Sequence, residues 1–232
     1  MARMEFVLHA GGKVSPVARD VRRLINAGYT GRDQEAVRHH IEELRAHGVP
    51  APASTPTLYA KPASLLTQGP AIEVLGGHTS GEAEFVLLVA RGRVLVAAGS
   101  DHTDRELEKV SIEKAKMMCP NVLSREVWDL AEVRDGWDDI VLRGYATAQG
   151  RRVLYQEARL GAMMTPEDLM ALAKGRTDGD LEGLALFSGT VPMLGGEMVF
   201  GQRFEAELVD SRRGRTLRCD YRIAPLGYLK EG

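Results

Sequence analysis

Three acidic residues stand where two apolar segments begin and end. Glu82 and Glu84 open the run EFVLLVA, and Asp101 closely follows the next apolar run, VLVAAG. In a β-strand, residues two apart share a face, so the two glutamates would lie roughly 6 to 7 Å apart on one side. If they are buried there, their mutual repulsion and lost hydration neutralise one of them or require a cation. A solvent-exposed strand end is the alternative explanation of the pair.

The segment after VLVAAG adds the third carboxylate. Thr103 and Glu106 have the spacing of a capping box, which predicts a helix from Asp104 to Met118 and leaves Asp101 in the loop before it. A hairpin between the two strands would return this loop to the neighbourhood of Glu82. Three carboxylates from two strand ends form a ligand set typical of Mg²⁺, Mn²⁺ or Ca²⁺.

Two histidines flank the same segments and offer a competing interpretation. His78 precedes the first strand, and His102 directly follows Asp101. An imidazole at either position could join a metal site or act as a general base near neutral pH. The alternative for both is an ordinary surface histidine in a loop.

The strands that must position these residues are numerous and short. Eight segments have strand character: AIEVL, EFVLLVA, VLVAAG, DIVLRGYA, RVLYQEA, LALFSG, FEAELVD and TLRCDYRI. Besides the helix from Asp104 to Met118, the pattern predicts a helix from Pro166 to Lys174. Strands in hairpin-like groups with few helices predict an α+β fold with a strongly curved mixed sheet. Because the chain contains no GxGxxG, GxxxxGK[ST] or GxSxG, nucleotide-binding and serine-hydrolase motifs are excluded.

The N-terminal part has a different pattern. We predict a strand from Glu5 to His9, a helix from Val17 to Ile25, and a second helix in TGRDQEAVRHHIEELRAHGVPAP that stops at Gly48 and Pro50. Prolines are frequent between residues 50 and 62, which indicates an irregular connection. We therefore divide the chain into an N-terminal lead-in, residues 1–55, and a metal-binding catalytic domain, residues 56–232.

Composition limits the partners and the compartment. The 232 residues include 30 Lys and Arg and 32 Asp and Glu, and neither sign forms a long block, so nucleic acid is not an expected partner. The two cysteines, Cys119 and Cys219, lack the spacing of a disulfide framework or zinc site. The chain contains no stretch of roughly 20 apolar residues and no secretory h-region. We expect a protein of the cytoplasm without membrane association.

Four segments resemble motifs of the fumarylacetoacetate hydrolase superfamily, and within it a group of uncharacterised bacterial members. YAKPASLLTQGPAIEVL resembles the aromatic-x-Lys-Pro segment, and GEAEFVLLV is similar to the E-x-E metal strand. SDHTDRELE is similar to N-D-x-S-x-R-D-x-Q, and LFSGTVP resembles the T-G-T-P or S-G-T turn. The segments follow the order of the family across residues 56–224. The resemblance implies the curved mixed β-sheet roll of that family and a homodimer.

The same resemblance implies roles for particular residues. Glu82, Glu84 and Asp101 would bind the metal, Mg²⁺ or Mn²⁺ with Ca²⁺ as a further option. Arg105 would be the motif arginine, and Gly189 and Thr190 would hold the substrate carboxylate.

The chain departs from the family pattern in three places, the first being that only 16 residues separate Glu84 from Asp101, fewer than the family usually has. Glu108 stands where the family has glutamine, and the lysine segment K-x-F-D-x-x-x-P is matched only approximately, by KAKMMCP. On a continuous helix from Asp104, Lys114 shares the apolar face while Lys116 lies nearly opposite at about 100° per residue, which favours Lys114 as the catalytic lysine. The alternative is that both lysines are solvated.

The implied activity is that of a metal-dependent hydrolase that cleaves a carbon–carbon bond in a small 2-oxo or 1,3-dicarbonyl carboxylic acid through a metal-stabilised enolate. His102 or Glu108 would activate the water. Decarboxylation, tautomerisation and dehydration share the enolate and remain alternatives. A ligand-binding scaffold without catalysis is an alternative of another class.

Overall fold

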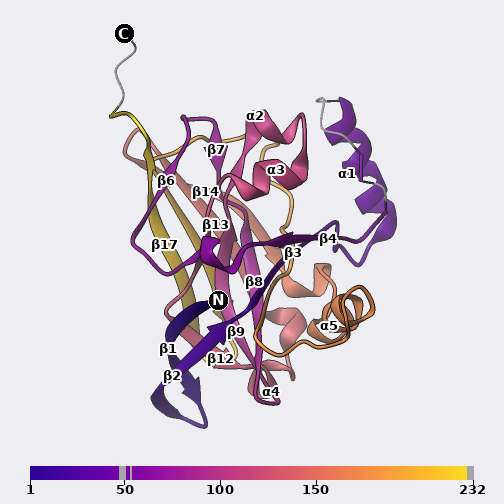
Figure 1. Ribbon diagram of the computed structural model, residues 1–232, viewed down its shortest axis with the longest axis vertical. Helices are drawn as coiled ribbons and strands as arrows, with labels where there is room; N and C mark the ends of the chain where they lie inside the picture. The colour runs from indigo at the N-terminus through magenta and orange to yellow at the C-terminus, as the bar shows by residue number, and fades with distance from the viewer. Residues whose placement is uncertain (47–50, 53, 229–232) are drawn as a thin grey trace.

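A computed structural model describes residues 1–46, 51–52 and 54–228 of the chain, and strands dominate it (Figure 1). The strands of the first half are β1 (Ala2–Ala10), β2 (Lys13–Val21), β3 (Arg23–Gly28), β4 (Thr57–Lys61), β5 (Leu66–Thr67), β6 (Ala71–Val74), β7 (Thr79–Ser80), β8 (Ala83–Ala90), β9 (Arg93–Asp101) and β10 (Thr103–Asp104). Those of the second half are β11 (Asn121–Leu123), β12 (Glu126–Asp129), β13 (Val141–Ala148), β14 (Arg151–Arg159), β15 (Leu184–Phe187), β16 (Arg203–Asp210) and β17 (Arg215–Pro225).

The helices are few and mostly short. The α-helices are α1 (Gln34–Ala46), α2 (Arg105–Glu108), α3 (Ile112–Met117), α4 (Leu130–Val133) and α5 (Pro166–Gly175), and the 3₁₀ turns are η1 (Ala63–Leu65), η2 (Trp137–Asp139) and η3 (Leu160–Ala162). Helices α2 and α3 lie together at one end of the long strands, and α4 lies at the other end (Figure 1).

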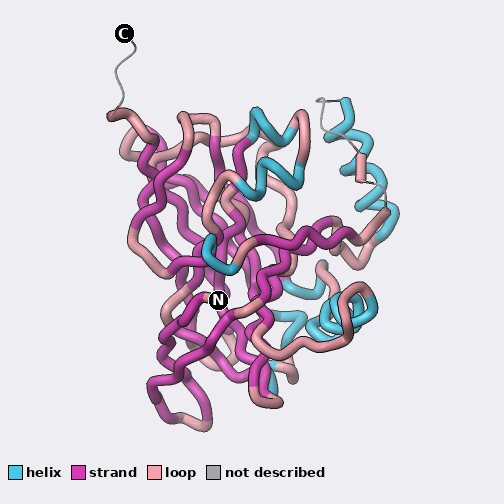
Figure 2. Tube along the Cα trace, viewed as in Figure 1, coloured by secondary structure: helices cyan, strands magenta, loops and turns pink. Residues whose placement is uncertain are grey.

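Two curved sheets form the body of the molecule (Figure 2). The larger sheet has the order β2-β1-β12-β9-β8-β15-β3-β4, with β11 paired to β9 and β5 paired to β11. The smaller sheet has the order β14-β13-β16-β17-β6. Most neighbours are antiparallel, whereas β1 with β12, β11 with β5, β15 with β3, and β17 with β6 are parallel. This curved mixed arrangement with few helices confirms the predicted fold class.

The central hairpin of β8 and β9 is apolar on both faces because each face is buried against a different core. Phe85 and Leu87 belong to the core between the two sheets, together with side chains of the smaller sheet such as Phe204. Val86 and Leu88 belong to a second core on the opposite side of the larger sheet. Burial on both sides fixes the register of β8, and therefore the positions of the glutamates at its start.

The N-terminal residues are part of the larger sheet. The predicted helix from Val17 to Ile25 is wrong, because this segment forms most of β2 and the start of β3. Gly11 and Gly12, both with positive φ, turn the chain between β1 and β2, so that all of β2 pairs with β1. The second predicted helix is confirmed as α1. Its predicted stop at Gly48 and Pro50 lies outside the described residues.

The segment after β9 also differs from the prediction. Instead of one helix from Asp104 to Met118, the chain forms α2 and α3. Asp104 itself caps α2 by accepting hydrogen bonds from the amides of Glu106 and Leu107, so Thr103 is not the cap. Ser111 then caps α3 by accepting a hydrogen bond from the amide of Lys114. Because a polar cap competes with continued helix, the chain changes direction before Ser111.

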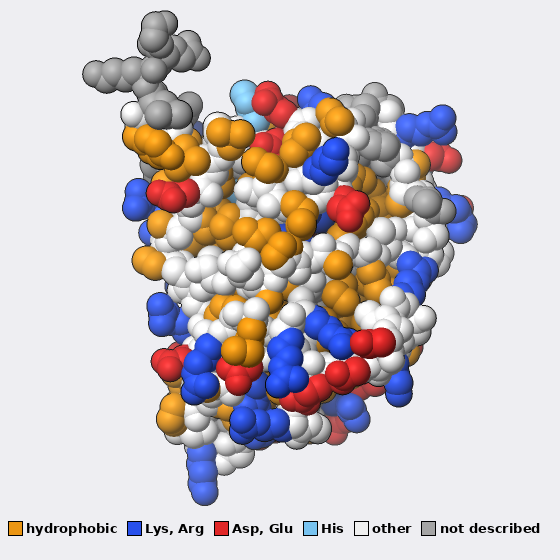
Figure 3. All heavy atoms as spheres, viewed as in Figure 1, with side chains coloured by type: hydrophobic (Ala, Val, Ile, Leu, Met, Phe, Trp, Pro, Cys, Tyr) orange, Lys and Arg blue, Asp and Glu red, His pale blue; other side chains and the backbone are white. Residues whose placement is uncertain are grey.

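On the face seen in Figure 3, positive and negative side chains are interspersed on the lower part, and hydrophobic side chains gather on the middle and upper part. This face shows no extended patch of one charge, in agreement with the near-balanced composition. Among the described residues, no helix combines the length and the hydropathy needed to cross a bilayer.

Candidate metal centre

The three predicted metal ligands converge at one end of the β8–β9 hairpin. Glu82 immediately precedes β8, Glu84 lies on β8, and Asp101 ends β9. The pairing of Ala83 with Ser100 and a hydrogen bond from the amide of Asp101 to the carbonyl of Glu82 align the two strand ends. One carboxylate oxygen from each acid lies within 4.8 Å of the others. Glu84 and Asp101 are buried, and Glu82 is nearly so.

Lys116 is the lysine of this cluster. Its Nζ atom lies 2.5 Å from Oδ2 of Asp101 and 3.0 Å from Oε2 of Glu82. Lys114, by contrast, is exposed, and the prediction that it faces the site is wrong. A single helix from Asp104 would turn Lys114 inward, but the break before Ser111 rotates α3 so that Lys116 points inward instead.

A second lysine, which the sequence analysis left without a role, lies behind Asp101. The side chain of Lys61, at the end of β4, is fully buried. Its Nζ atom lies 3.5 Å from Oδ1 of Asp101 and donates hydrogen bonds to the carbonyl of Cys119 and to Oδ1 of Asn121. The sequence feature that could have indicated a role for Lys61 is the aromatic-x-Lys-Pro motif, which contains this lysine. Asp101 is therefore placed between two ammonium groups.

Burial and the neighbouring charges shift the pKa values of the two glutamates in opposite directions. Burial opposes ionisation of Glu82, but the charges of Lys116 and Arg105 outweigh it and lower the pKa of this carboxyl to about 2. Burial raises the pKa of Glu84 well above its usual range, and the negative charges of Asp101 and Glu82 raise it further. A nearby cation would therefore favour the ionised form of Glu84.

Arg105 and Glu108 adjoin the cluster but bind each other. The guanidinium of Arg105 donates from Nη1 to Oε2 of Glu108 at 2.9 Å and from Nε to Oγ of Ser80 at 2.7 Å. Its Nη2 atom lies 3.1 Å from Oε1 of Glu82. Every nitrogen of the guanidinium therefore has a partner within the protein. The expected substrate-binding role of Arg105 would require it to give up one of them.

Gly189 and Thr190 are also beside the cluster, in the turn after β15. The amide of Gly189 donates to Oε2 of Glu84 at 2.9 Å, and the hydroxyl of Thr190 donates to the carbonyl of Ala83 at 2.8 Å. Both donors predicted to hold a substrate carboxylate are therefore used to position β8. Gly189 has φ of +80°, and a Cβ atom there would lie 2.7 Å from Oγ1 of Thr30, so a side chain is excluded on both grounds.

Gln156 connects this turn to the E-x-E strand. Its Oε1 atom accepts from the amide of Ala83, and its Nε2 atom donates to Oγ1 of Thr190 and to the carbonyl of Val191. One amide on β14 thus joins β8 to the segment after β15. The sequence contained this glutamine in a strand but gave no indication of its partners.

His102 does not face the site, which contradicts its expected role as a base. Its Nδ1 atom lies 2.8 Å from the hydroxyl of Tyr221 and its Nε2 atom 2.9 Å from Oγ1 of Thr79, and the residue is fully buried. Burial lowers its pKa to about 3. His78 is exposed and pairs with Glu106 on the surface. Neither imidazole lies against the carboxylate cluster.

Two small cavities adjoin the cluster and share Glu82, Glu108 and Thr190 as lining residues. The first, about 100 Å³, is also lined by Tyr29, Tyr59, Ile112 and Lys116. The second, about 80 Å³, is also lined by Arg105, Tyr155, Gln156 and Met198. These volumes are small compared with ordinary ligand pockets of roughly 300 to 1,000 Å³, so the site fits a small molecule.

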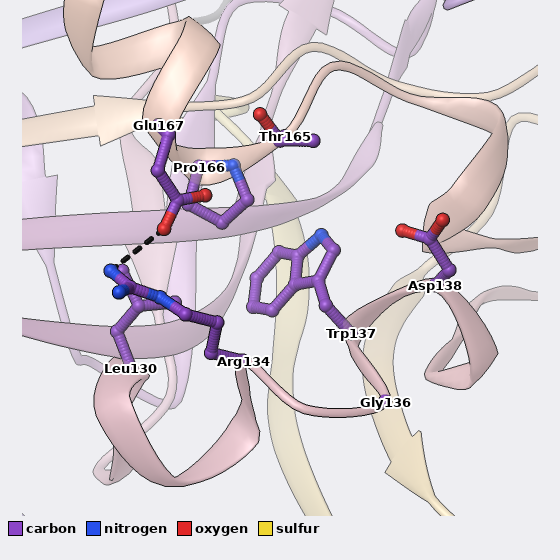
Figure 4. Close-up of a pocket in the computed structure, with 8 residues that line it drawn as sticks. All are labelled: Leu130, Arg134, Gly136, Trp137, Asp138, Thr165, Pro166 and Glu167. Atoms are coloured by element: carbon purple, nitrogen blue, oxygen red, sulfur yellow. Dashed lines mark ion pairs between the residues drawn. The ribbon is translucent and has the colours of Figure 1, made fainter.

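A larger hollow of about 450 Å³ lies elsewhere, where α4, η2 and the start of α5 meet (Figure 4). The ion pair of Arg134 and Glu167 lies at its edge, and Trp137 forms part of its wall. Trp137 packs edge-on against Phe85 of the core, and Asp138 pairs with Arg32. None of these lining residues belongs to the carboxylate cluster.

Comparison with solved structures places the fold among enzymes of known architecture. A structure titled Cg1458 with inhibitor aligns with a TM-score of 0.66 and 16% identity, over 92% of this chain and 81% of that chain. A 2-keto-3-deoxy-D-arabinonate dehydratase complexed with magnesium and 2,5-dioxopentanoate aligns with a TM-score of 0.65 and 14% identity, over 89% and 74%. Fumarylacetoacetate hydrolase from Exiguobacterium antarcticum aligns with a TM-score of 0.59 and 17% identity, over 94% and 80%. The chain therefore shares the fold of fumarylacetoacetate hydrolase.

Sequence comparison gives a narrower assignment. No curated protein sequence matches the chain. The sequence profile of a family described as proteins of unknown function, DUF2848, matches residues 27–221, which is most of the chain. This protein belongs to the DUF2848 family.

Proposed function

We propose that this protein is a divalent-metal-dependent enzyme that acts on a small 2-oxo or 1,3-dicarbonyl carboxylic acid. The observation that carries the proposal is the convergence of Glu82, Glu84 and Asp101, whose ligand atoms lie within 4.8 Å of one another beside two cavities. The shared fold with a dehydratase complexed with magnesium and 2,5-dioxopentanoate supports it.

The residues fit a hard cation. All three ligands offer carboxylate oxygen, and Oδ1 of Asp101 is buried without a hydrogen-bond partner. Burial and the neighbouring carboxylates raise the pKa of Glu84, so a nearby positive charge would favour its ionised form. Three carboxylates are a ligand set that Mg²⁺ and Mn²⁺ accept, since hard cations prefer oxygen ligands.

The bound ion would polarise the 2-oxo and carboxylate oxygens of the substrate and stabilise the negative charge that develops on it. Lys116 lines the first cavity and contributes a fixed positive charge beside the ligands. The charges of Asp101 and Glu82 raise its pKa well above the usual value despite burial, so this ammonium stays protonated. Lys116 acts by electrostatic stabilisation rather than as a base.

Glu108 is the candidate base. It lines both cavities, whereas His102 lines neither and has both ring nitrogens hydrogen-bonded. A carboxylate at this position can take a proton from a water or from the carbon next to the substrate carbonyl. The ion pair with Arg105 keeps Glu108 oriented toward the shared wall of the cavities.

The reaction we assign is hydrolysis of a carbon–carbon bond. Dehydration is the second candidate, favoured by the similarity in fold to the 2-keto-3-deoxy-D-arabinonate dehydratase. Decarboxylation and tautomerisation develop the same negative charge on the substrate. The products distinguish these reactions, because hydrolysis yields two fragments and dehydration yields one product lighter by one water.

A substrate panel tests the proposal. The protein is incubated with Mn²⁺ and with acylpyruvates, 2-oxo acids and 2-oxo-3-deoxy sugar acids, and the products are identified by mass spectrometry. We expect metal-dependent turnover that Glu84→Gln abolishes and Glu106→Gln, an exposed control, preserves. Absence of turnover across the panel in a protein that binds Mn²⁺ would instead favour a ligand-binding scaffold. Unchanged turnover in Glu84→Gln would reject the site.

A further inference from the structure

The charges around the cluster are nearly balanced. Among the described residues, four carboxylates and three cationic side chains form one contact network: Glu82, Glu84, Asp101 and Glu108 with Lys61, Arg105 and Lys116. The fully ionised set has one negative charge in excess, and a divalent cation converts this into one positive charge. Because uncompensated charge is costly away from water, such a site matches a ligand with a single negative charge.

No cation in this network is available for a second carboxylate. Arg105 is the only cationic residue that lines the second cavity within the part of the chain that the structure describes, and its three nitrogens are engaged by Ser80, Glu108 and Glu82. Lys116 is engaged by Glu82 and Asp101. A second anionic group would have to break one of these ion pairs.

The remaining cavity walls are uncharged apart from acidic groups. Tyr29, Tyr59 and Ile112 contribute to the first cavity, and Tyr155, Met193 and Met198 contribute to the second. Glu108 lines both of them. The far end of a ligand held at the metal ligands therefore meets neutral side chains and the carboxylate of Glu108.

We propose that Glu108 makes the site selective for 2-oxo acids with one negative charge, whose far end is apolar or hydroxylated, and excludes those with a second carboxylate. This inference rests on the proposed function, since it takes a 2-oxo acid at the metal as given. It specifies the substrate class further and assigns the selectivity to one residue.

A matched pair of ligands tests it. 2-Oxopentanoate and 2-oxopentanedioate have the same carbon chain and the same chelating end, and they differ only in the terminal methyl or carboxylate. Binding to the Mn²⁺-loaded protein is measured by calorimetry, with titrations into Mn²⁺ alone as blanks. We expect the wild type to bind the monoanion at least about tenfold more tightly, a difference of about 1.4 kcal/mol, because the second carboxylate of the dianion would lie beside the like charge of Glu108.

Two substitutions assign the preference to Glu108. Glu108→Gln keeps the shape of the side chain, removes its charge and weakens its attraction for Nη1 of Arg105, so we expect it to strengthen dianion binding about tenfold and to change monoanion binding by less than about threefold. Glu106→Gln removes the same charge from an exposed position on the same helix and should leave the ratio unchanged.

The outcomes separate this inference from the proposed function. Equal or tighter binding of the dianion by the wild type would overturn the selectivity while leaving the 2-oxo acid assignment intact, and this result needs no variant. An unchanged ratio in Glu108→Gln would overturn the role of Glu108. Failure of the Mn²⁺-loaded protein to bind either ligand would contradict the proposed function itself, and the selectivity with it.

Discussion

Lys116 and Asp101 form a buried ion pair, with Nζ 2.5 Å from Oδ2, that joins helix α3 to the end of β9. The same ammonium lies 3.0 Å from Oε2 of Glu82. One side chain thus links the short helices over the strand ends to two of the three proposed metal ligands. It also gives a sharp test of which lysine serves the site.

Lys116→Met and Lys114→Met form a matched pair of variants. Loss of one partner from a buried ion pair costs about 3 to 5 kcal/mol, so we expect Lys116→Met to lower the free energy of unfolding by about that amount. We also expect it to reduce turnover by at least about 100-fold, in the range of a lost electrostatic donor. Lys114→Met changes an exposed position, so its free energy of unfolding should lie within about 0.5 kcal/mol of the wild-type value. Urea unfolding and steady-state kinetics measure both, and the opposite ranking would contradict the assignment.

Gln156→Leu tests the link between the E-x-E strand and the turn after β15. The substitution leaves the amide of Ala83 and the carbonyl of Val191 without their partner. Each unsatisfied buried group costs about 1 to 3 kcal/mol, so we expect a loss of stability of about 2 to 6 kcal/mol. We also expect weaker Mn²⁺ binding, by about 10- to 100-fold, because Glu84 follows Ala83 directly.

The control for this prediction is Gln202→Leu. Gln202 is exposed on the surface, where its side-chain oxygen accepts a hydrogen bond from the amide of Gln149. The free energy of unfolding and the calorimetric Mn²⁺ affinity of this variant should both be close to the wild-type values. Equal Mn²⁺ affinity in Gln156→Leu and Gln202→Leu would show that the glutamine network does not position the ligands.

The convergence of the three acidic residues could be predicted from the sequence because it depends on local pattern. The spacing of Glu82 and Glu84 by two residues and the short connection between β8 and β9 are visible in the sequence. A hairpin of these two strands brings Glu82 and Asp101 together independently of the rest of the fold. The positions of Gly189 and Thr190 beside the cluster followed from the resemblance. The use of their donors to hold β8 depends on tertiary contacts that no local pattern shows.

The lysines and His102 could not be placed in this way. The direction of Lys116 depends on a helix break of a few residues, and a wheel drawn through that break assigns the wrong face. Lys61 lies near Asp101 because β5, which closely follows it, pairs with β11, and β11 pairs with the end of β9. His102 adjoins Asp101 in sequence, but it follows a strand end, where successive side chains point to opposite sides, and it enters the core toward Tyr221.

The two cysteines provide a test of the core that is independent of catalysis. Cys119 and Cys219 are each 1% exposed, and burial raises the pKa of both thiols, that of Cys119 to about 12. We expect iodoacetamide at pH 8 to modify neither thiol in the native protein and both in urea, as counted by mass spectrometry. Rapid labelling of the native protein would contradict the packing described for these strands.

The same pKa shifts predict a direction for stability at high pH. A thiol with its pKa raised on folding stays protonated in the native state while the unfolded chain loses the proton, near its usual value of about 9. The native state then binds more protons, so the free energy of unfolding falls as the pH rises above 9. Cys119→Ala should reduce this slope, and an unchanged slope would argue against the burial of the thiol.

Calorimetric titration with Mn²⁺ measures whether Glu82, Glu84 and Asp101 together hold one divalent cation. We predict one Mn²⁺ per chain for the wild type and for Glu106→Gln, and a loss of affinity of at least about 100-fold in Glu84→Gln and Asp101→Asn. Circular dichroism establishes that the variants are folded. Mn²⁺ binding of wild-type strength in both folded ligand variants, or no binding by the wild type, would contradict the claim.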